Sequence, residues 1–130
     1  MLVEPAYKPD WEIPGGAVEA DESPRECAIR EVHEELGLVV EPGRLLVFDY
    51  QHPEPQRTES LMFIFDGGVL EDRERRKLKL ANDELTSYAF VDPTELGSLT
   101  TARLARRVQH ALEVASSAEL AYVENGRVPA

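Results

Sequence analysis

Three glutamates lie close together in the first third of the chain: Glu31, Glu34 and Glu35. Positions i, i+3 and i+4 share one side of an α-helix, so a helix here would place the three carboxylates side by side. Each like-charged pair costs a helix roughly 0.2–0.5 kcal/mol, and the helix dipole disfavours anions near a C-terminus. Carboxylate oxygens are the ligands that Mg2+ and Mn2+ prefer. The spacing therefore predicts a site for a divalent cation.

The residues on either side of the glutamates carry the start and stop signals of a helix. Ser23 and Glu26 form a capping box, with proline at the first helical position between them. Gly37 suits the position just beyond a helix C-terminus. We expect a helix from about Pro24 to Leu36. The glutamates adjoin its apolar arc, where the wall of a cleft would lie; that arc consists of Ala28, Ile29, Val32 and Leu36.

The rest of the chain alternates between strand and helix patterns. The apolar runs Leu45–Tyr50 and Leu61–Phe65 predict buried strands. Further strands are expected in the segments Met1–Tyr7, Lys77–Leu80, Ser87–Val91 and Ala121–Val128, the last with an Asn125-Gly126 turn. A helical turn is expected after Asp92 and an amphipathic helix over Thr101–Ala115, with Arg103, Arg106 and Arg107 solvated. These elements indicate an α/β or α+β layer fold in one domain, residues 1–130.

Composition narrows the class of protein. The chain is 42% apolar and 30% charged, as in ordinary soluble globular proteins. Its net charge of −11 argues against a nucleic-acid partner, which would need a basic surface. No apolar run approaches the ~18 residues of a membrane span. The single cysteine, Cys27, excludes an internal disulfide and favours a reducing compartment, so we expect a cytoplasmic protein.

The stretch from Gly16 to Leu38 resembles the signature of the Nudix hydrolase family. That signature reads Gly-x5-Glu-x7-Arg-Glu-U-x-Glu-Glu-x-Gly-U, with U a bulky aliphatic residue. It is matched here by Gly16, Glu22, Arg30, Glu31, Val32, Glu34, Glu35, Gly37 and Leu38. A Trp-x-x-Pro-Gly-Gly run, Trp11 to Gly16, precedes it, as in the family. The resemblance implies a Nudix-like α/β/α sandwich, with a mixed sheet between helices, and a pyrophosphohydrolase that uses Mg2+ or Mn2+.

The resemblance also implies roles for individual residues. The metal ligands would be the Gly15 carbonyl and the carboxylates of Glu31, Glu34 and Glu35. Glu31 and Glu34 would also serve catalysis, together with a later carboxylate, for which Glu84 is the candidate and Asp83 the runner-up. Glu84 could instead belong to an ordinary surface turn. Glu22 and Arg30 would pair and hold the loop over the helix.

The signature sets the chemistry and leaves the substrate open. The family hydrolyses the phosphoanhydride bond of a nucleoside diphosphate linked to another group. Pro53, fifteen residues beyond Leu38, slightly favours ADP-ribose; nucleoside triphosphates and nucleotide sugars stay possible. Phe48 or Tyr50 could stack on a base or simply belong to a strand core. The alternative is a catalytically silent nucleotide sensor, which usually loses signature glutamates that this chain keeps.

The segment before the signature departs from the family. A complete strand and hairpin normally lie there, whereas ten residues precede Trp11, so the N-terminal strand region is incomplete. The chain could start late, could complete its sheet from a partner, or could tolerate a smaller sheet. Because an open sheet edge promotes aggregation, we expect a homodimer.

Overall fold

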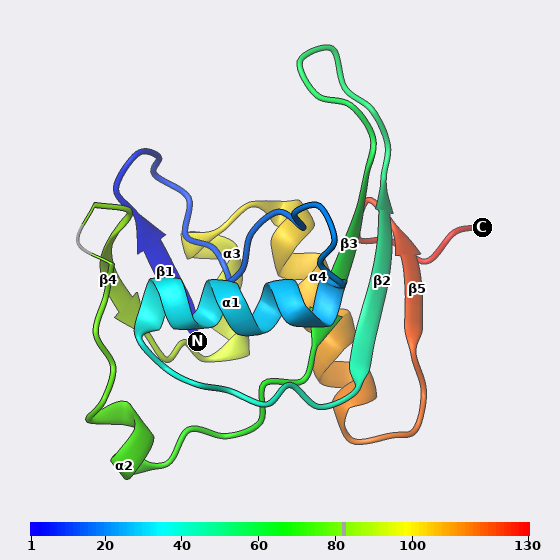
Figure 1. The fold of residues 1–130 in the computed structure, drawn as a ribbon. Helices are drawn as coiled ribbons and strands as arrows, with labels where there is room; N and C mark the ends of the chain where they lie inside the picture. Colours follow the sequence, from blue (N-terminus) through cyan, green and yellow to red (C-terminus); the bar gives the residue numbers. More distant parts are fainter. Residues whose placement is uncertain (82) are drawn as a thin grey trace. The chain divides into compact units, whose positions relative to one another are not determined.

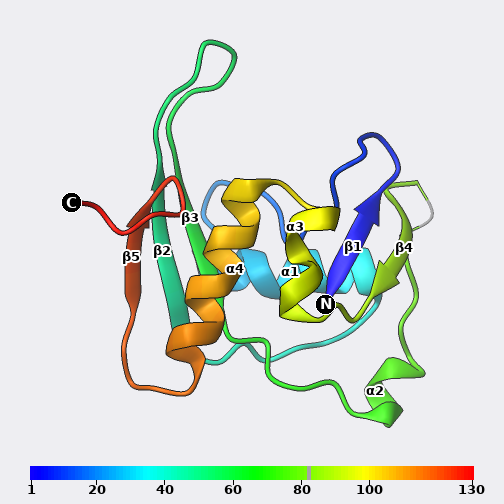
Figure 2. The ribbon, with the colours of Figure 1, turned by 180° about the vertical axis from the view of Figure 1, so that it is seen from behind.

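The computed structural model describes residues 1–81 and 83–130, which form two compact units. The first unit comprises residues 1–43 and 67–100, and the second comprises residues 44–66 and 101–130. Figures 1 and 2 show the elements of both from opposite sides. None of the described helices combines the length and apolar character needed to cross a bilayer. The assignment of residues 1–130 to a single domain stays a prediction.

The first unit is built around α1, Pro24–Leu36, with the bounds that the sequence predicted. The Ser23 hydroxyl accepts a hydrogen bond from the Glu26 amide at 3.1 Å, and the Glu26 carboxylate accepts one from the Ser23 amide at 2.8 Å. These reciprocal bonds satisfy two amide groups that the first helical turn leaves without partners. Gly37, with φ 69°, ends the helix in the left-handed conformation that glycine tolerates best.

A two-stranded antiparallel sheet completes the core of this unit. It pairs β1, Leu2–Pro5, with β4, Leu85–Ala89 (Figure 1). The predicted strand Ser87–Val91 therefore exists but begins and ends two residues earlier. The buried cluster that joins sheet and helix consists of Val3, Leu36, Leu38 and Leu85. Packing of this cluster stabilises the C-terminal half of α1, where the glutamates lie.

Short helices and an extended segment make up the remainder of the first unit. They are α2, Asp72–Arg75, the 3-10 helix Pro93–Glu95, and α3, Leu96–Leu99. The predicted strand at Lys77–Leu80 is wrong, because this segment is turn and coil and pairs with no strand among the described residues. Its alternating pattern has another cause: the amides of Lys79 and Ala81 donate to the carbonyls of Leu36 and Glu35 at 2.9 and 3.0 Å. The segment thus satisfies the last carbonyls of α1.

The second unit is a three-stranded sheet covered on one face by a helix. The strands are β2, Leu45–Gln51, β3, Ser60–Phe65, and β5, Ala121–Glu124, in the order β3-β2-β5. β3 is antiparallel and β5 parallel to β2, so the predicted mixed sheet is confirmed. The helix α4, Ala102–Ala115, is capped by Thr101 and lies across the sheet (Figure 2).

A buried ion pair joins α4 to β2. Arg107, which was expected to be solvated, is only 5% exposed. Its guanidinium pairs with Asp49 and donates a 2.8 Å hydrogen bond to Gln51 Oε1. Asp49 and Gln51 alternate with Phe48 and Tyr50 along β2, so they point to the helix side of the sheet. Helical periodicity placed Arg107 correctly on α4 but could not show that a carboxylate lies opposite.

Candidate metal and catalytic site

A pocket of ≈ 330 Å³ in the first unit brings several predicted site residues together. It lies among β1, the loop before α1, α1 itself and the start of β4. The predicted residues on its wall are Gly15, Glu31, Glu35 and Glu84. They share this wall with Val3, Pro5, Tyr7, Glu12, Ile13, Gly16 and Leu85. Two predicted carboxylates of α1 therefore share one cavity with a third, Glu84, that lies far from them in the sequence.

Glu35 is the most deeply placed of these carboxylates. It is 7% exposed, and its Oε1 accepts a long, 3.4 Å hydrogen bond from the Gly15 amide. Burial raises the pKa of Glu35 to about 7, and the negative charges of Glu31 and Glu84 act in the same direction, while the Gly15 amide opposes them. The described residues that line the pocket include four carboxylates and no basic side chain, although Arg30 and Lys8 reach Glu31 and Glu12 from outside it. A bound cation would remove that imbalance.

The loop before α1 lies directly against Glu31. A Cβ atom on Gly16 would be 2.3 Å from Glu31 Cδ, so only glycine leaves room for the carboxylate in its observed position. Gly15 adopts φ 154°, which side chains other than glycine rarely allow. The two glycines therefore let the loop backbone lie close to the acidic side of α1.

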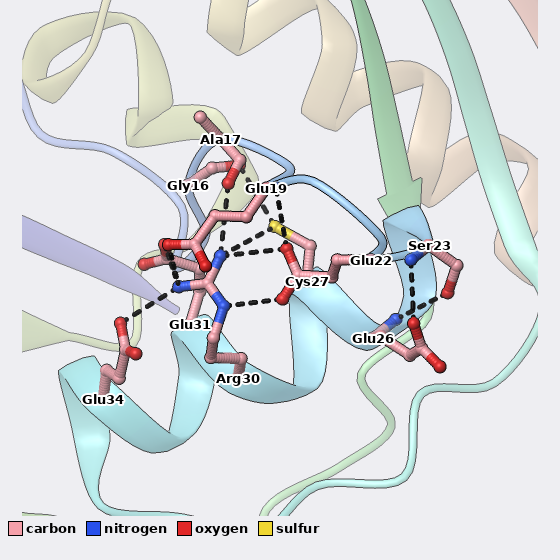
Figure 3. Close-up of polar contacts among 10 residues, drawn as sticks. All are labelled: Gly16, Ala17, Glu19, Glu22, Ser23, Glu26, Cys27, Arg30, Glu31 and Glu34. Carbon is pink, nitrogen blue, oxygen red and sulfur yellow. Dashed lines mark hydrogen bonds and ion pairs between the residues drawn. The ribbon is translucent and has the colours of Figure 1, made fainter.

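Arg30 links the loop to the helix (Figure 3). Its Nε and Nη2 donate to Glu22 at 2.6 and 3.1 Å, which is the ion pair that the sequence predicted, and Nη2 also donates to the Ala17 carbonyl at 3.2 Å. The hydrogen bonds from Arg30 and from the Glu19 amide lower the pKa of Glu22 to about 2. Arg30 thereby fixes the loop that carries Gly15.

The same guanidinium also holds two of the predicted metal ligands. Arg30 Nη1 donates to Glu31 at 2.9 Å and to Glu34 at 3.2 Å (Figure 3). The Glu34 side chain is 54% exposed and does not line the pocket. Within the described residues, no three His, Cys, Asp or Glu side chains already surround a common cation position. The hard oxygens and surplus charge of the pocket nevertheless fit a divalent cation, provided that the exposed Glu34 side chain rotates.

Glu84 and Glu12 complete the acidic wall. The Glu84 backbone is anchored, because its carbonyl accepts from the Ala6 amide at 2.8 Å, while its side chain is exposed. Glu12 was not singled out from the sequence, although it lies inside the Trp-x-x-Pro-Gly-Gly run that was. Its backbone exchanges hydrogen bonds with Val3 at 2.8 and 2.9 Å, and its carboxylate pairs with Lys8. Its position within that run was the available signal.

Comparisons with known proteins agree with this geometry. A family model described as NUDIX domain matches residues 2–112. Human diphosphoinositol polyphosphate phosphohydrolase 3-alpha is 37% identical over 75 residues, which is 57% of this chain but only 46% of that protein. The chain thus matches less than half the length of this relative.

Solved structures share the fold. A MutT protein from Methanosarcina mazei Go1 superposes with a TM-score of 0.71 at 25% identity, over 89% of this chain and 84% of that one. An ADP-ribose pyrophosphatase from Streptococcus suis 89-1591 gives a TM-score of 0.64 at 23% identity, over 95% and 87% of the two chains. These likenesses confirm the predicted fold class.

Proposed function

The chain belongs to the NUDIX family, and on that premise we propose that it is a divalent-cation-dependent pyrophosphohydrolase. The reaction would be hydrolysis of a phosphoanhydride bond in a nucleoside diphosphate linked to another group. The observation that carries the proposal is the buried Glu35 carboxylate, held with Glu31 and Glu84 in one pocket. Burying an acidic group beside two others is unfavourable unless a cation compensates the charge.

The proposed metal ligands come from the loop and from α1. Glu35 and Glu31 face the pocket, the Gly15 carbonyl is the loop ligand, and Glu34 would join them on leaving Arg30. We propose Mg2+, with Mn2+ as an alternative, since both prefer hard oxygen ligands. When bound, such an ion neutralises charge on the diphosphate oxygens and helps to orient an attacking water. The chain's own task is then to position these groups and to accept one proton.

Glu84 is well placed to accept that proton. No hydrogen bond to its carboxylate is present within residues 1–81 and 83–130, so its oxygens are available to a water molecule in the pocket. Its backbone carbonyl accepts a hydrogen bond from the Ala6 amide, directly after β1, which gives the side chain a defined origin. Glu31 and Glu34 are the other candidates for the base, but both carboxylates accept hydrogen bonds from Arg30. A free carboxylate is the better acceptor, so we favour Glu84.

For the substrate, we favour ADP-ribose or a similar nucleoside diphosphate derivative. A neighbour of similar fold is described as an ADP-ribose pyrophosphatase, and Pro53 lies at the position expected in such enzymes. Diphosphoinositol phosphates, which the human relative's name implies, are the competing class and contain no aromatic ring.

A panel assay tests both the reaction and the substrate. The protein would be incubated with Mg2+ and ADP-ribose, nucleotide sugars, nucleoside triphosphates or a diphosphoinositol phosphate in 18O-labelled water, and the products followed by phosphorus NMR. We expect turnover of ADP-ribose that Glu35→Gln lowers by orders of magnitude. Glu41→Gln is the matched control, because Glu41 is highly exposed and pairs only with Arg25 at 3.0 Å among the described contacts. Nucleotide binding without turnover of any compound would instead support the silent sensor.

Two further expectations from the sequence stay predictions. A cytoplasmic location is tested by fractionation of cells that express the protein. A homodimer is tested by light scattering during size-exclusion chromatography.

A further inference from the structure

One strand of the second unit ends its sheet without any covering strand. β3 is the first strand in the order β3-β2-β5, so it pairs through one edge only. Within the described residues, every backbone hydrogen bond of residues 60–65 belongs to the ladder with β2. A strand edge of this kind presents a row of unpaired amides and carbonyls to any other extended chain.

The composition of β3 leaves that edge unprotected. Its sequence, SLMFIF, contains no charged residue and no proline. Leu61 is 53% exposed and Met62 37% exposed, although both are large apolar residues. Natural edge strands usually carry a lysine, a proline or a bulge that discourages pairing with another chain. A six-residue uncharged window of high β propensity has the opposite character.

Other strands of the protein do carry such protection. β5, at the opposite end of the same sheet, has only four residues and contains Glu124, which pairs back with Arg127 across a turn. In the first unit, β1 contains Pro5, and the backbone of Glu12 covers Val3 from the outer side. The lack of any such device in β3 therefore distinguishes its edge from those of β5 and β1.

We propose that β3 pairs antiparallel with β3 of a second copy of this chain, so that the two three-stranded sheets become continuous. Identical strands related by a two-fold axis place apolar residues opposite apolar residues at nearly every position. With the axis at Phe63, Leu61 lies opposite Phe65 of the other copy and Met62 opposite Ile64. Ser60 then lies opposite Asp66, and Glu59 opposite Gly67, so no two acidic residues face each other.

Charge explains why the contact would form here. Each chain carries a net charge of −11, so two copies repel each other over most of their surfaces. The uncharged strand β3 is a place where they can approach without opposing like charges. Phe63 also continues the aromatic row of Phe48 and Tyr122, and a second copy would extend that row across the axis. This inference names a surface for the expected homodimer and does not depend on the proposed hydrolysis.

The test is the oligomeric state of the full chain in solution, measured by light scattering during size-exclusion chromatography over a range of concentrations. We expect the wild type to show twice the monomer mass and the double variant Leu61→Lys/Met62→Lys to show the monomer mass. Leu112→Lys is the matched control, because Leu112 is 48% exposed on α4, and it should keep the dimer. Circular dichroism would verify folding, and the single variant Leu61→Lys would replace the double variant if that fails to fold.

Cross-linking tests the pairing itself. In a Cys27→Ser background, Phe63→Cys should form an intermolecular disulfide under mild oxidation, because the two residues meet at the axis, whereas Leu112→Cys should not. A monomer mass for the wild type at every concentration would overturn the proposal. So would a dimer that persists in the folded lysine variants, because its interface would then lie elsewhere.

Discussion

Replacing Glu35 by glutamine should stabilise the metal-free protein while abolishing its proposed activity. Glu35 is nearly fully buried and shares its pocket with Glu31 and Glu84, whose charges repel it, so its ionised form is poorly solvated and disfavoured. Glutamine has almost the same shape, and its amide oxygen can still accept the hydrogen bond from the Gly15 amide. The substitution therefore removes an unfavourable charge and leaves the packing unchanged.

The raised pKa of Glu35 gives the size of the expected gain in the free energy of unfolding and the direction in which that gain changes with pH. The pKa of Glu35 is about 7 in the folded protein and 4.5 ordinarily. At about 1.36 kcal/mol for each pH unit, this difference corresponds to ~3 kcal/mol. Between these two values the folded state binds more protons than the unfolded state, so the wild type loses stability as the pH rises from about 4.5 to about 7. Above that range, Glu35→Gln should be more stable by up to ~3 kcal/mol, and near pH 4.5 the advantage should vanish.

The assay is urea denaturation of both proteins in EDTA at several pH values between 4.5 and 8. Glu34→Gln is the control, because Glu34 lies on the same helix but is 54% exposed, and it should not gain stability with rising pH. A Glu35→Gln variant that is no more stable than wild type at pH 8 would refute the reasoning. An advantage that is constant across the pH range would refute it equally, because it would not come from ionisation.

Three further predictions concern the residues around the site and the core. Glu22→Gln should be less stable than the wild type at neutral pH, because the lowered pKa of Glu22 stabilises the fold only while the carboxylate is ionised. The difference in the free energy of unfolding should shrink as the pH falls from about 4.5 towards 2. Urea denaturation at several pH values measures it. Asp49→Ala should cost about 3–5 kcal/mol in the same assay, because it leaves the buried Arg107 without its partner. Gly16→Ala should displace the flexible Glu31 carboxylate, so calorimetry should show weaker Mn2+ binding while thermal unfolding stays close to that of wild type.

Local signals in the sequence were enough to place α1. The first turn of the helix is capped by the side chains of Ser23 and Glu26, and the helix ends at Gly37. All three residues act within about one turn of their own positions, so the bounds of the helix depend on no distant residue. The Glu22–Arg30 pair followed from the resemblance to a family. The segment Lys77–Leu80 could not be predicted in the same way, because alternation does not reveal whether the partner is a strand or the carbonyls of a helix end.

The site was only partly predictable for a related reason. Helical spacing placed Glu31, Glu34 and Glu35 on one side of α1, but the pocket wall includes Glu31 and Glu35 and leaves Glu34 outside. Spacing gives the side of the helix but not the direction in which each side chain extends, and the Glu34 side chain is 54% exposed. Burial of Arg107 likewise depends on Asp49, which lies 58 residues away in the sequence.

The central claim is that the pocket of Glu31, Glu35 and Glu84 binds a divalent cation, and calorimetric titration tests it most directly. Mn2+ and Mg2+ would be added at pH 8 to the wild type and to Glu35→Gln, each with and without ADP-ribose. We predict saturable uptake by the wild type and its loss in the variant. No uptake by the wild type under any of these conditions, or equal uptake by both proteins, would contradict the account.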